Sequence, residues 1–251
     1  RFDASAIYWR DKMTKPEMTG PEMTGPEMDG PEMNGPSDFA VAARTDFTEI
    51  PVIDISALAD LDRFDETAHH LVSVARDIGF FYLTHHGIPA ALCEDAFAAS
   101  REFFGLSDDQ KADVSVDHQQ RGWMAQGMAT LEGAKTSDAK EVFFWGRDVA
   151  PDDPDVLQGR ALVAPNQWPD RHAPRLKQQL LPYYDAVLDL SRLVLRALAR
   201  GLGKQPDFFA PAYVNPLGRG QLVYYPPQTD TDRNAERFGA AAHSDFGVLT
   251  I

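Results

Sequence analysis

The hydrophobic positions that begin near Ile50 predict a short strand followed by a helix. The run from Ile50 to Ser56 is rich in β-branched residues, and Pro51 places it at the start or edge of a strand. From Asp65 to Ile78 hydrophobic residues recur at helical spacing, and Gly79 stands where the cap of that helix is expected.

The pattern continues with a second strand and two further helices. Phe80 to Leu83 is hydrophobic or aromatic at every position, which predicts a buried strand. A helix is expected from about Ala90 to Phe104. Ser107 and Gln110 have the spacing of a capping box that opens a third helix.

Two aromatic strands, an ordered loop and one long helix are predicted in the middle of the chain. The segments R-G-W-M and K-E-V-F-F-W-G, between Arg121 and Gly146, are the strand candidates. Residues 148–174 contain five prolines and are expected to form an ordered loop. The helix is expected from about Arg175 to Arg200, with Gly201 ending it and Pro182 kinking or restarting it.

A last strand is expected at Gln221–Tyr225, where two prolines stop it. Helices therefore dominate the first two thirds of the chain, and short strands its end. That order predicts an α+β fold, in which helices pack on an antiparallel β-barrel that begins near residue 220. Phe143 and Trp145 alternate with Phe144, so they are expected either to line the mouth of the barrel or to pack in its core.

Composition narrows the classes of function. A formal net charge of −14 argues against binding to nucleic acid or anionic membranes. No hydrophobic run approaches the roughly 20 residues of a membrane helix, and no signal peptide is visible. Cys93 is the only cysteine, which excludes an internal disulfide and fits a reducing compartment such as the cytoplasm. Its hydrophobic helical surroundings are typical of a core residue.

Both ends of the chain have unusual features. Residues 16–35 are four tandem pentapeptides of the type PEMTG, which predict a disordered low-complexity tail over residues 1–37. A copper-binding role for the methionines of the repeats stays open. The chain begins at Arg1 and ends inside the hydrophobic run V-L-T-I, so we expect a fragment truncated within the barrel.

His243 and Asp245 are the candidate metal ligands. In an extended chain two residues that stand two apart point to the same side. One imidazole and one carboxylate are two thirds of the facial triad that holds non-haem ferrous iron and leaves positions open for oxygen and a co-substrate. The other reading is a histidine at a strand end beside a solvated aspartate.

The other histidines predict no second metal site. One of His69 and His70 must face solvent. His85 and His86 are adjacent in an extended segment and point to opposite faces, so we expect them to make structural hydrogen bonds. Should a third iron ligand come from within the chain, its candidates are His85, His86, His118 and His172.

Seven segments together resemble a known family. In chain order they are I-P-V-I-D-I, R-D-I-G-F-F-Y-L-T-H-H-G-I, R-G-W, K-E-V-F-F-W-G, P-N-Q-W-P, L-V-Y-Y-P-P and A-H-S-D-F-G-V-L-T. This series resembles the isopenicillin N synthase-like family of iron(II) oxygenases, most of which depend on 2-oxoglutarate. The resemblance covers about residues 50–251.

The resemblance implies a double-stranded β-helix (jelly roll) with a long helix along one side and a largely helical N-terminal region. Residues 48–165 would be the non-haem dioxygenase N-terminal region, and residues 166–251 the long helix and the start of the jelly roll. His243 and Asp245 would be the first two iron ligands, and Tyr225 would contact 2-oxoglutarate. The distal histidine ligand and the arginine that pairs with 2-oxoglutarate would lie beyond residue 251.

The implied function is oxidation of a small organic substrate coupled to decarboxylation of 2-oxoglutarate. It requires Fe(II), 2-oxoglutarate and O2, and indicates no nucleic-acid, membrane or protein partner. Two alternatives stay open: an iron oxidase of the same family that uses no 2-oxoglutarate, and a non-catalytic member. Val223 stands where many members have the asparagine that binds the co-substrate.

Overall fold

The structure is a computed structural model that describes residues 50–128, 139–227 and 247–251. The predicted tail at residues 1–37 lies outside the described residues. The first described elements are β1 (Val52–Asp54), the 3-10 helix η1 (Ser56–Ala59) and helix α1 (Leu61–Asp77). Strand β2 (Tyr82–Thr84) then pairs with β1 in parallel.

The boundaries of α1 have local causes. The carboxylate of Asp60 accepts a hydrogen bond from the backbone N–H of Asp62, so the helix starts earlier than the predicted Asp65. At the other end Gly79 adopts a φ of +86°, a left-handed conformation that glycine tolerates. The predicted helix and its glycine stop are confirmed.

The prediction that Phe80–Leu83 forms a buried strand is wrong in its burial. Phe80 is 70% exposed and Tyr82 is 60% exposed, whereas Phe81 and Leu83 pack against buried residues. Successive side chains of a strand point to opposite faces. Phe81 and Leu83 point toward the hydrophobic core, whereas Phe80 and Tyr82 point to solvent. A continuous hydrophobic run in the sequence does not reveal that one face of the strand is exposed.

Two helices follow with nearly the predicted bounds. Helix α2 spans Ala90–Phe104 and helix α3 spans Asp108–Ala112. The Ser107 hydroxyl accepts a hydrogen bond from the Gln110 backbone N–H, and the Gln110 side-chain oxygen accepts one from the Ser107 N–H. The predicted capping box is thus confirmed. Cys93 is half-buried on α2.

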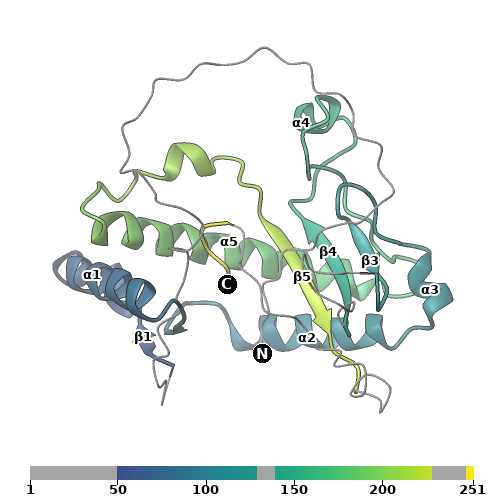
Figure 1. The fold of residues 1–251 in the computed structure, drawn as a ribbon, viewed down its shortest axis with the longest axis horizontal. Coiled ribbons are helices and arrows are strands. Elements are labelled where there is room, and N and C mark those ends of the chain that lie inside the picture. Colours follow the sequence, from purple (N-terminus) through teal and green to yellow (C-terminus); the bar gives the residue numbers. More distant parts are fainter. Residues whose placement is uncertain (1–49, 129–138, 228–246) are drawn as a thin grey trace, which may run out of the picture.

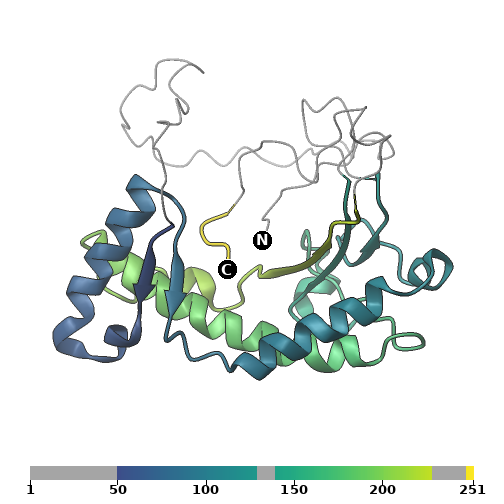
Figure 2. The ribbon, with the colours of Figure 1, turned by 90° about the horizontal axis from the view of Figure 1, so that it is seen from below.

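The long helix α5 (Arg175–Gly201) runs the length of the molecule, with α1 and α2 packed against it (Figures 1 and 2). It continues through Pro182, so the predicted restart is wrong. Pro182 is exposed, while the helix has buried leucines on both sides of it, at Leu180 and Leu190. The buried leucines before and after Pro182 stabilise the continuous helix, although the low helix propensity of proline would favour an interruption.

A three-stranded antiparallel sheet covers the other end of α5. Its strands are β3 (Gly122–Met124), β4 (Glu141–Gly146) and β5 (Arg219–Tyr224), in the order β3-β4-β5. Helix α4 (Pro154–Leu157) and the 3-10 helix η2 (Ala210–Tyr213) lie in the connections. The two aromatic strands predicted between Arg121 and Gly146 are confirmed as β3 and β4, and β5 near residue 220 joins them in one sheet.

Two hydrophobic cores lie along α5. We call the first the helical core; it includes Ile53, Leu71, Leu190 and Val194. We call the second the sheet core; it includes Phe103, Trp123, Phe143, Trp145, Leu176 and Leu180. Of the two readings for Phe143 and Trp145, the structure therefore shows core packing. Phe144 lies on the opposite face of the sheet with Met124 and Val142.

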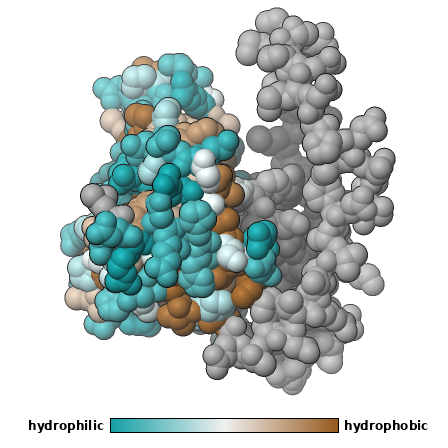
Figure 3. Space-filling view, turned by 90° about the vertical axis from the view of Figure 1, so that its left-hand side faces the viewer, coloured by the Kyte–Doolittle hydropathy of each residue, from teal (hydrophilic) through white to brown (hydrophobic). Residues whose placement is uncertain are grey.

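The surface at the α1 end is mostly hydrophilic, and hydrophobic residues gather toward its lower margin (Figure 3). None of the helices in the described part of the chain is long and apolar enough to cross a bilayer.

Candidate functional site

The structure describes one of the three predicted site residues, Tyr225, and the ends of the stretch that carries the other two. Tyr225 follows β5 directly and is 36% exposed. His243 and Asp245 lie outside the described residues. The next described segment, Gly247–Ile251, returns to the helical core, where Leu249 packs. The stretch thus begins beside the sheet and ends against the helical core.

The register of β5 decides which side chains share a face with Tyr225. Leu222 packs against the sheet core, and a Cβ on Gly220 would come within 2.2 Å of the Trp145 ring, so even-numbered positions face the helices. Val223 packs against Met124, Val142 and Phe144 on the other face. Because side chains alternate, Tyr225 is expected to continue the face of Val223.

The donor set suits the metal that the sequence predicts. A neutral imidazole and a carboxylate are ligands of non-haem ferrous iron, so His243 and Asp245 fit that ion chemically. The phenol of Tyr225 can donate a hydrogen bond to a carboxylate oxygen. In residues 50–128, 139–227 and 247–251, no group of three or more His, Cys, Asp or Glu side chains could hold a metal.

Three of the histidines considered as a third ligand make polar contacts elsewhere. His85 Nδ1 lies 3.0 Å from Asp54 Oδ1, and His86 Nδ1 accepts a hydrogen bond from the Ile88 N–H. His172 Nε2 lies 2.9 Å from Asp113 Oδ2. Three of the candidates for a third ligand within the chain are therefore engaged elsewhere, as the structural reading of His85 and His86 predicts.

Asn166 and Gln167 connect the proline-rich loop of residues 148–174 to the sheet through hydrogen bonds. Asn166 Oδ1 accepts a hydrogen bond of 2.8 Å from the Gly146 N–H, and its amide nitrogen donates one of 3.0 Å to the Gly146 carbonyl. Gln167 donates to the Arg121 carbonyl. One amide thus satisfies both backbone groups at the end of β4. The motif P-N-Q-W-P marks this loop in the sequence, but its spacing does not reveal these partners.

Arg121, the arginine of R-G-W, is buried at the same end of the sheet. It is 2% exposed, and it donates to the backbone carbonyls of Gln119, Gln120 and Leu162. Burial lowers the pKa of its guanidinium. The nearby charge of Asp117 partly offsets this effect of burial.

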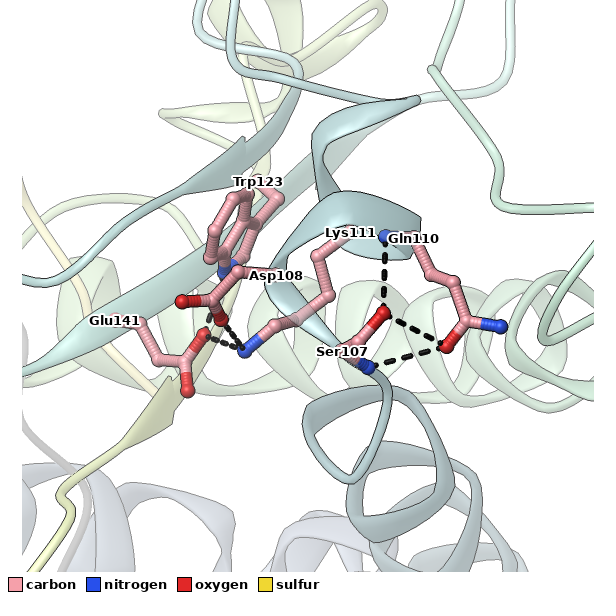
Figure 4. A network of polar contacts seen from close by, with 6 residues as sticks. All are labelled: Ser107, Asp108, Gln110, Lys111, Trp123 and Glu141. Atoms are coloured by element: carbon pink, nitrogen blue, oxygen red, sulfur yellow. Dashed lines mark hydrogen bonds and ion pairs between the residues drawn. The ribbon is translucent and has the colours of Figure 1, made fainter.

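A buried polar cluster joins α3 to the sheet (Figure 4). Lys111 Nζ lies 2.7 Å from Glu141 Oε2 and 3.0 Å from Asp108 Oδ1. The Trp123 indole N–H donates to the same Glu141 oxygen, and Lys111 lies 4.8 Å from the centre of the Trp123 ring. The sequence marks Trp123 and Glu141 through R-G-W and K-E-V-F-F-W-G, but it gives no sign that Lys111 is buried with them.

Comparison with known proteins gives a consistent picture. Residues 50–171 match the sequence model of a family described as the N-terminal region of non-haem dioxygenases in morphine synthesis. The 2-oxoglutarate-dependent dioxygenase eupC of a Phoma species is 33% identical over 216 residues, which cover 80% of this chain and 67% of that protein. The 2-oxoglutarate-dependent dioxygenase tropC of Talaromyces stipitatus is 31% identical over 215 residues, which cover 80% and 65%.

A solved structure is similar in fold as well as in sequence. It is that of a full-length Neurospora crassa protein in complex with alpha-KG and thymine, with a TM-score of 0.65 and 25% identity. The match covers 79% of this chain and 62% of that chain. The chain thus spans about two thirds of the length of the relatives that it matches.

Proposed function

We propose that this chain, which belongs to the family of 2-oxoglutarate-dependent dioxygenases, contributes an active site that oxidises a small organic molecule with Fe(II), 2-oxoglutarate and O2. The observation that carries the proposal is the pair His243 and Asp245, in a chain of this family, after a strand that ends at Tyr225. Bound iron would supply the activation of oxygen. The relatives favour this function over an iron oxidase that uses no 2-oxoglutarate.

Each of the three residues has one role in this proposal. The His243 imidazole and the Asp245 carboxylate hold the iron, and their combined charge of −1 offsets half of its charge. The Tyr225 hydroxyl donates a hydrogen bond to a carboxylate of 2-oxoglutarate. Val223 stands beside it without a polar group, so Tyr225 carries more of the co-substrate contact than in members with asparagine there.

The proposed architecture is a jelly roll, of which the sheet β3-β4-β5 forms part and α5 the supporting helix. The proposed segments are a tail at residues 1–37, an N-terminal region at 48–165, and a region at 166–251 with the long helix and barrel strands. Since β3 and β4 come from the first region and β5 from the second, the sheet joins the two. With Cys93 as its only cysteine, the chain suits the reducing cytoplasm.

The test measures iron binding and 2-oxoglutarate consumption separately. We expect the purified full-length protein that contains this chain to bind ferrous ion under anaerobic conditions and to form succinate once 2-oxoglutarate and O2 are added. His243→Ala and Asp245→Ala should abolish both. Asp245→Glu should weaken iron binding, because its longer side chain displaces the carboxylate. His70→Ala, which removes an exposed histidine of α1, serves as the control.

The role of Tyr225 has its own readout. Tyr225→Phe should raise the KM for 2-oxoglutarate by about 10-fold or more, because a hydrogen bond to a charged group contributes roughly 1.5–3 kcal/mol. Its iron affinity should stay unchanged. Iron binding that survives in the two alanine variants would remove the proposed metal site, and an unchanged KM in Tyr225→Phe would remove the co-substrate contact.

A further inference from the structure

The face of β5 that carries Val223 also carries two polar side chains with buried, unsatisfied atoms. Arg219 Nε and Gln221 Oε1 are buried and have no hydrogen-bond partner. The Arg219 guanidinium carbon lies 5.5 Å from the centre of the Phe144 ring, which places Arg219 on the face of Phe144 and Val223. Side chains alternate between the two faces of β5, so Gln221, two residues after Arg219 and two before Val223, shares that face.

Among the residues that the structure describes, no carboxylate lies within ion-pair distance of Arg219. In the described part of the chain, six arginines lie within ion-pair distance of an aspartate, namely Arg76, Arg147, Arg160, Arg192, Arg196 and Arg200, whereas Arg219 has no such partner. Burial lowers the pKa of Arg219, and the positive charge of Arg121 lowers it further. Arg219 is half-buried, and its buried Nε atom has no hydrogen-bond partner, so the guanidinium can accept an anionic ligand.

The surroundings define a complementary ligand. Arg219 requires an anionic group, and a planar guanidinium matches a carboxylate in particular. Gln221 Oε1 requires an O–H or N–H donor, and it lies about 7 Å farther along the strand. Met124, Val142, Phe144 and Val223 form a hydrophobic wall beside both. The net charge of −14 disfavours general attraction of anions, so binding of an acid here depends on this local positive charge.

Arg219 and Tyr225 stand six positions apart, and an extended strand of that length spans about 20 Å between Cα atoms. We assign the two side chains to different ligands, Tyr225 to 2-oxoglutarate and Arg219 to another molecule. Competition with 2-oxoglutarate tests this assignment below.

We propose that Arg219 and Gln221 bind the substrate, and that the substrate is a small carboxylic acid with a hydrophobic body and an O–H or N–H donor. This inference rests on the function proposed above, because it takes this face of β5 as part of the active site. Arg219 holds the carboxylate, Gln221 accepts the hydrogen bond from the donor, and Phe144 keeps the guanidinium in place.

The test uses three matched probes and thermal melting, so that it does not depend on activity. The probes are 4-hydroxyphenylacetate, its primary amide, which lacks the charge, and phenylacetate, which lacks the hydroxyl. We expect 4-hydroxyphenylacetate to raise the Tm of the wild-type protein, and the other two to bind at least tenfold more weakly. Added 2-oxoglutarate should not displace it.

Two variants assign the binding to the named side chains. Arg219→Met should reduce affinity for 4-hydroxyphenylacetate at least tenfold, and should not lower the Tm of the free protein, because it removes an uncompensated charge. Gln221→Leu should abolish the preference for the hydroxylated acid over phenylacetate. Arg192→Met, which removes an exposed, paired arginine from α5, is the matched control for net charge.

The outcomes separate this inference from the proposed function. It is overturned if no acid binds, if the amide binds equally well, if Arg219→Met retains binding or loses several degrees of Tm, or if 2-oxoglutarate competes. Absence of 2-oxoglutarate consumption by the wild-type protein would instead overturn the proposed function, even where binding of the acid requires Arg219.

Discussion

Lys111 shows how a buried charge is stabilised at the level of a single residue. It is 4% exposed, beside Glu141, which is 8% exposed. Burial alone lowers the pKa of Lys111, but hydrogen bonds to Glu141 and Asp108 outweigh burial and raise it above its usual 10.5. The charge therefore persists at neutral pH, and α3 is held on the sheet by it.

Removing the charge of Lys111 should be costly. Lys111→Met leaves the Glu141 carboxylate buried without its cation, and we expect a loss of about 3–5 kcal/mol in the free energy of unfolding. Lys111→Met combined with Glu141→Gln should cost less than the sum of the single variants. Urea unfolding at neutral pH measures both quantities. Lys177→Met, which removes an exposed lysine 3.8 Å from Asp148, should cost less than about 1 kcal/mol. Strict additivity of Lys111 and Glu141 would contradict the coupling.

Asp65 and Arg200 join α1 to the end of α5 through a half-buried ion pair. Arg200 Nε donates a hydrogen bond of 2.7 Å to Asp65, and this bond lowers the pKa of Asp65 below its usual 3.8. The pair therefore contributes stability above pH 3.8, and the contribution is lost as the pH falls through the lowered pKa.

The variant Asp65→Asn tests this pH dependence. The difference in Tm between wild-type protein and Asp65→Asn should be present above about pH 5 and should shrink below about pH 4, where Asp65 becomes protonated. Melting curves across this range measure it. A difference that persists undiminished below that pH would show that Asp65 is not stabilised as a carboxylate.

At the scale of elements, the crossing of α1 and α5 depends on Gly201. A Cβ at this position would come within 2.3 Å of the Ala68 carbonyl oxygen and 2.6 Å of Val72 Cγ2. Gly201→Ala should therefore destabilise the protein by about 1–3 kcal/mol, although alanine is the better helix former. Gly105→Ala is the control, because its Cβ would meet the Arg101 carbonyl at 3.1 Å in a right-handed helical conformation. Equal unfolding free energies for the two variants would contradict this packing.

The sequence predicts the elements well where local signals determine them. Ser107 and Gly79 fix helix ends through their own side chains or conformations, so these ends are visible in the residues themselves, whereas the Asp60 cap that starts α1 is not predicted. Tertiary packing decides the cases that fail. The passage of α5 through Pro182 and the exposure of Phe80 depend on partners that are distant in sequence.

The same distinction applies to the candidate site. Tyr225 follows β5, close to where the pattern ends the strand, and His243 and Asp245 stay predictions that the described residues do not test. Arg219 and Gln221 carry no sequence signal. Only the pairing of β5 with β4 reveals that they share a face with Val223 and lack partners there.

At the scale of the whole molecule, α5 contributes to both cores. Leu180 lies in the sheet core and Leu190 in the helical core, on one continuous helix. We expect the cores to unfold together, so that Leu180→Ala and Leu190→Ala each lower the stability of a single transition by about 2–5 kcal/mol. Far-UV circular dichroism reports the helices. Tryptophan fluorescence reports mainly the sheet core, since three of the four tryptophans, Trp123, Trp145 and Trp168, lie in or against it. Separate midpoints by the two methods would show that α5 does not couple the cores.

The stretch that carries His243 and Asp245 begins beside the sheet and ends where Leu249 meets the helical core. If the proposed site is correct, substitutions that destabilise the two ends of this stretch should be compensated by different ligands. A substitution that loosens the helical core around Leu249 should produce an enzyme that excess iron restores. A substitution beneath Val223, such as Val142→Ala, should produce one that excess 2-oxoglutarate restores. Titrations with iron and with 2-oxoglutarate should therefore distinguish the two variants, although the residues act in one active site.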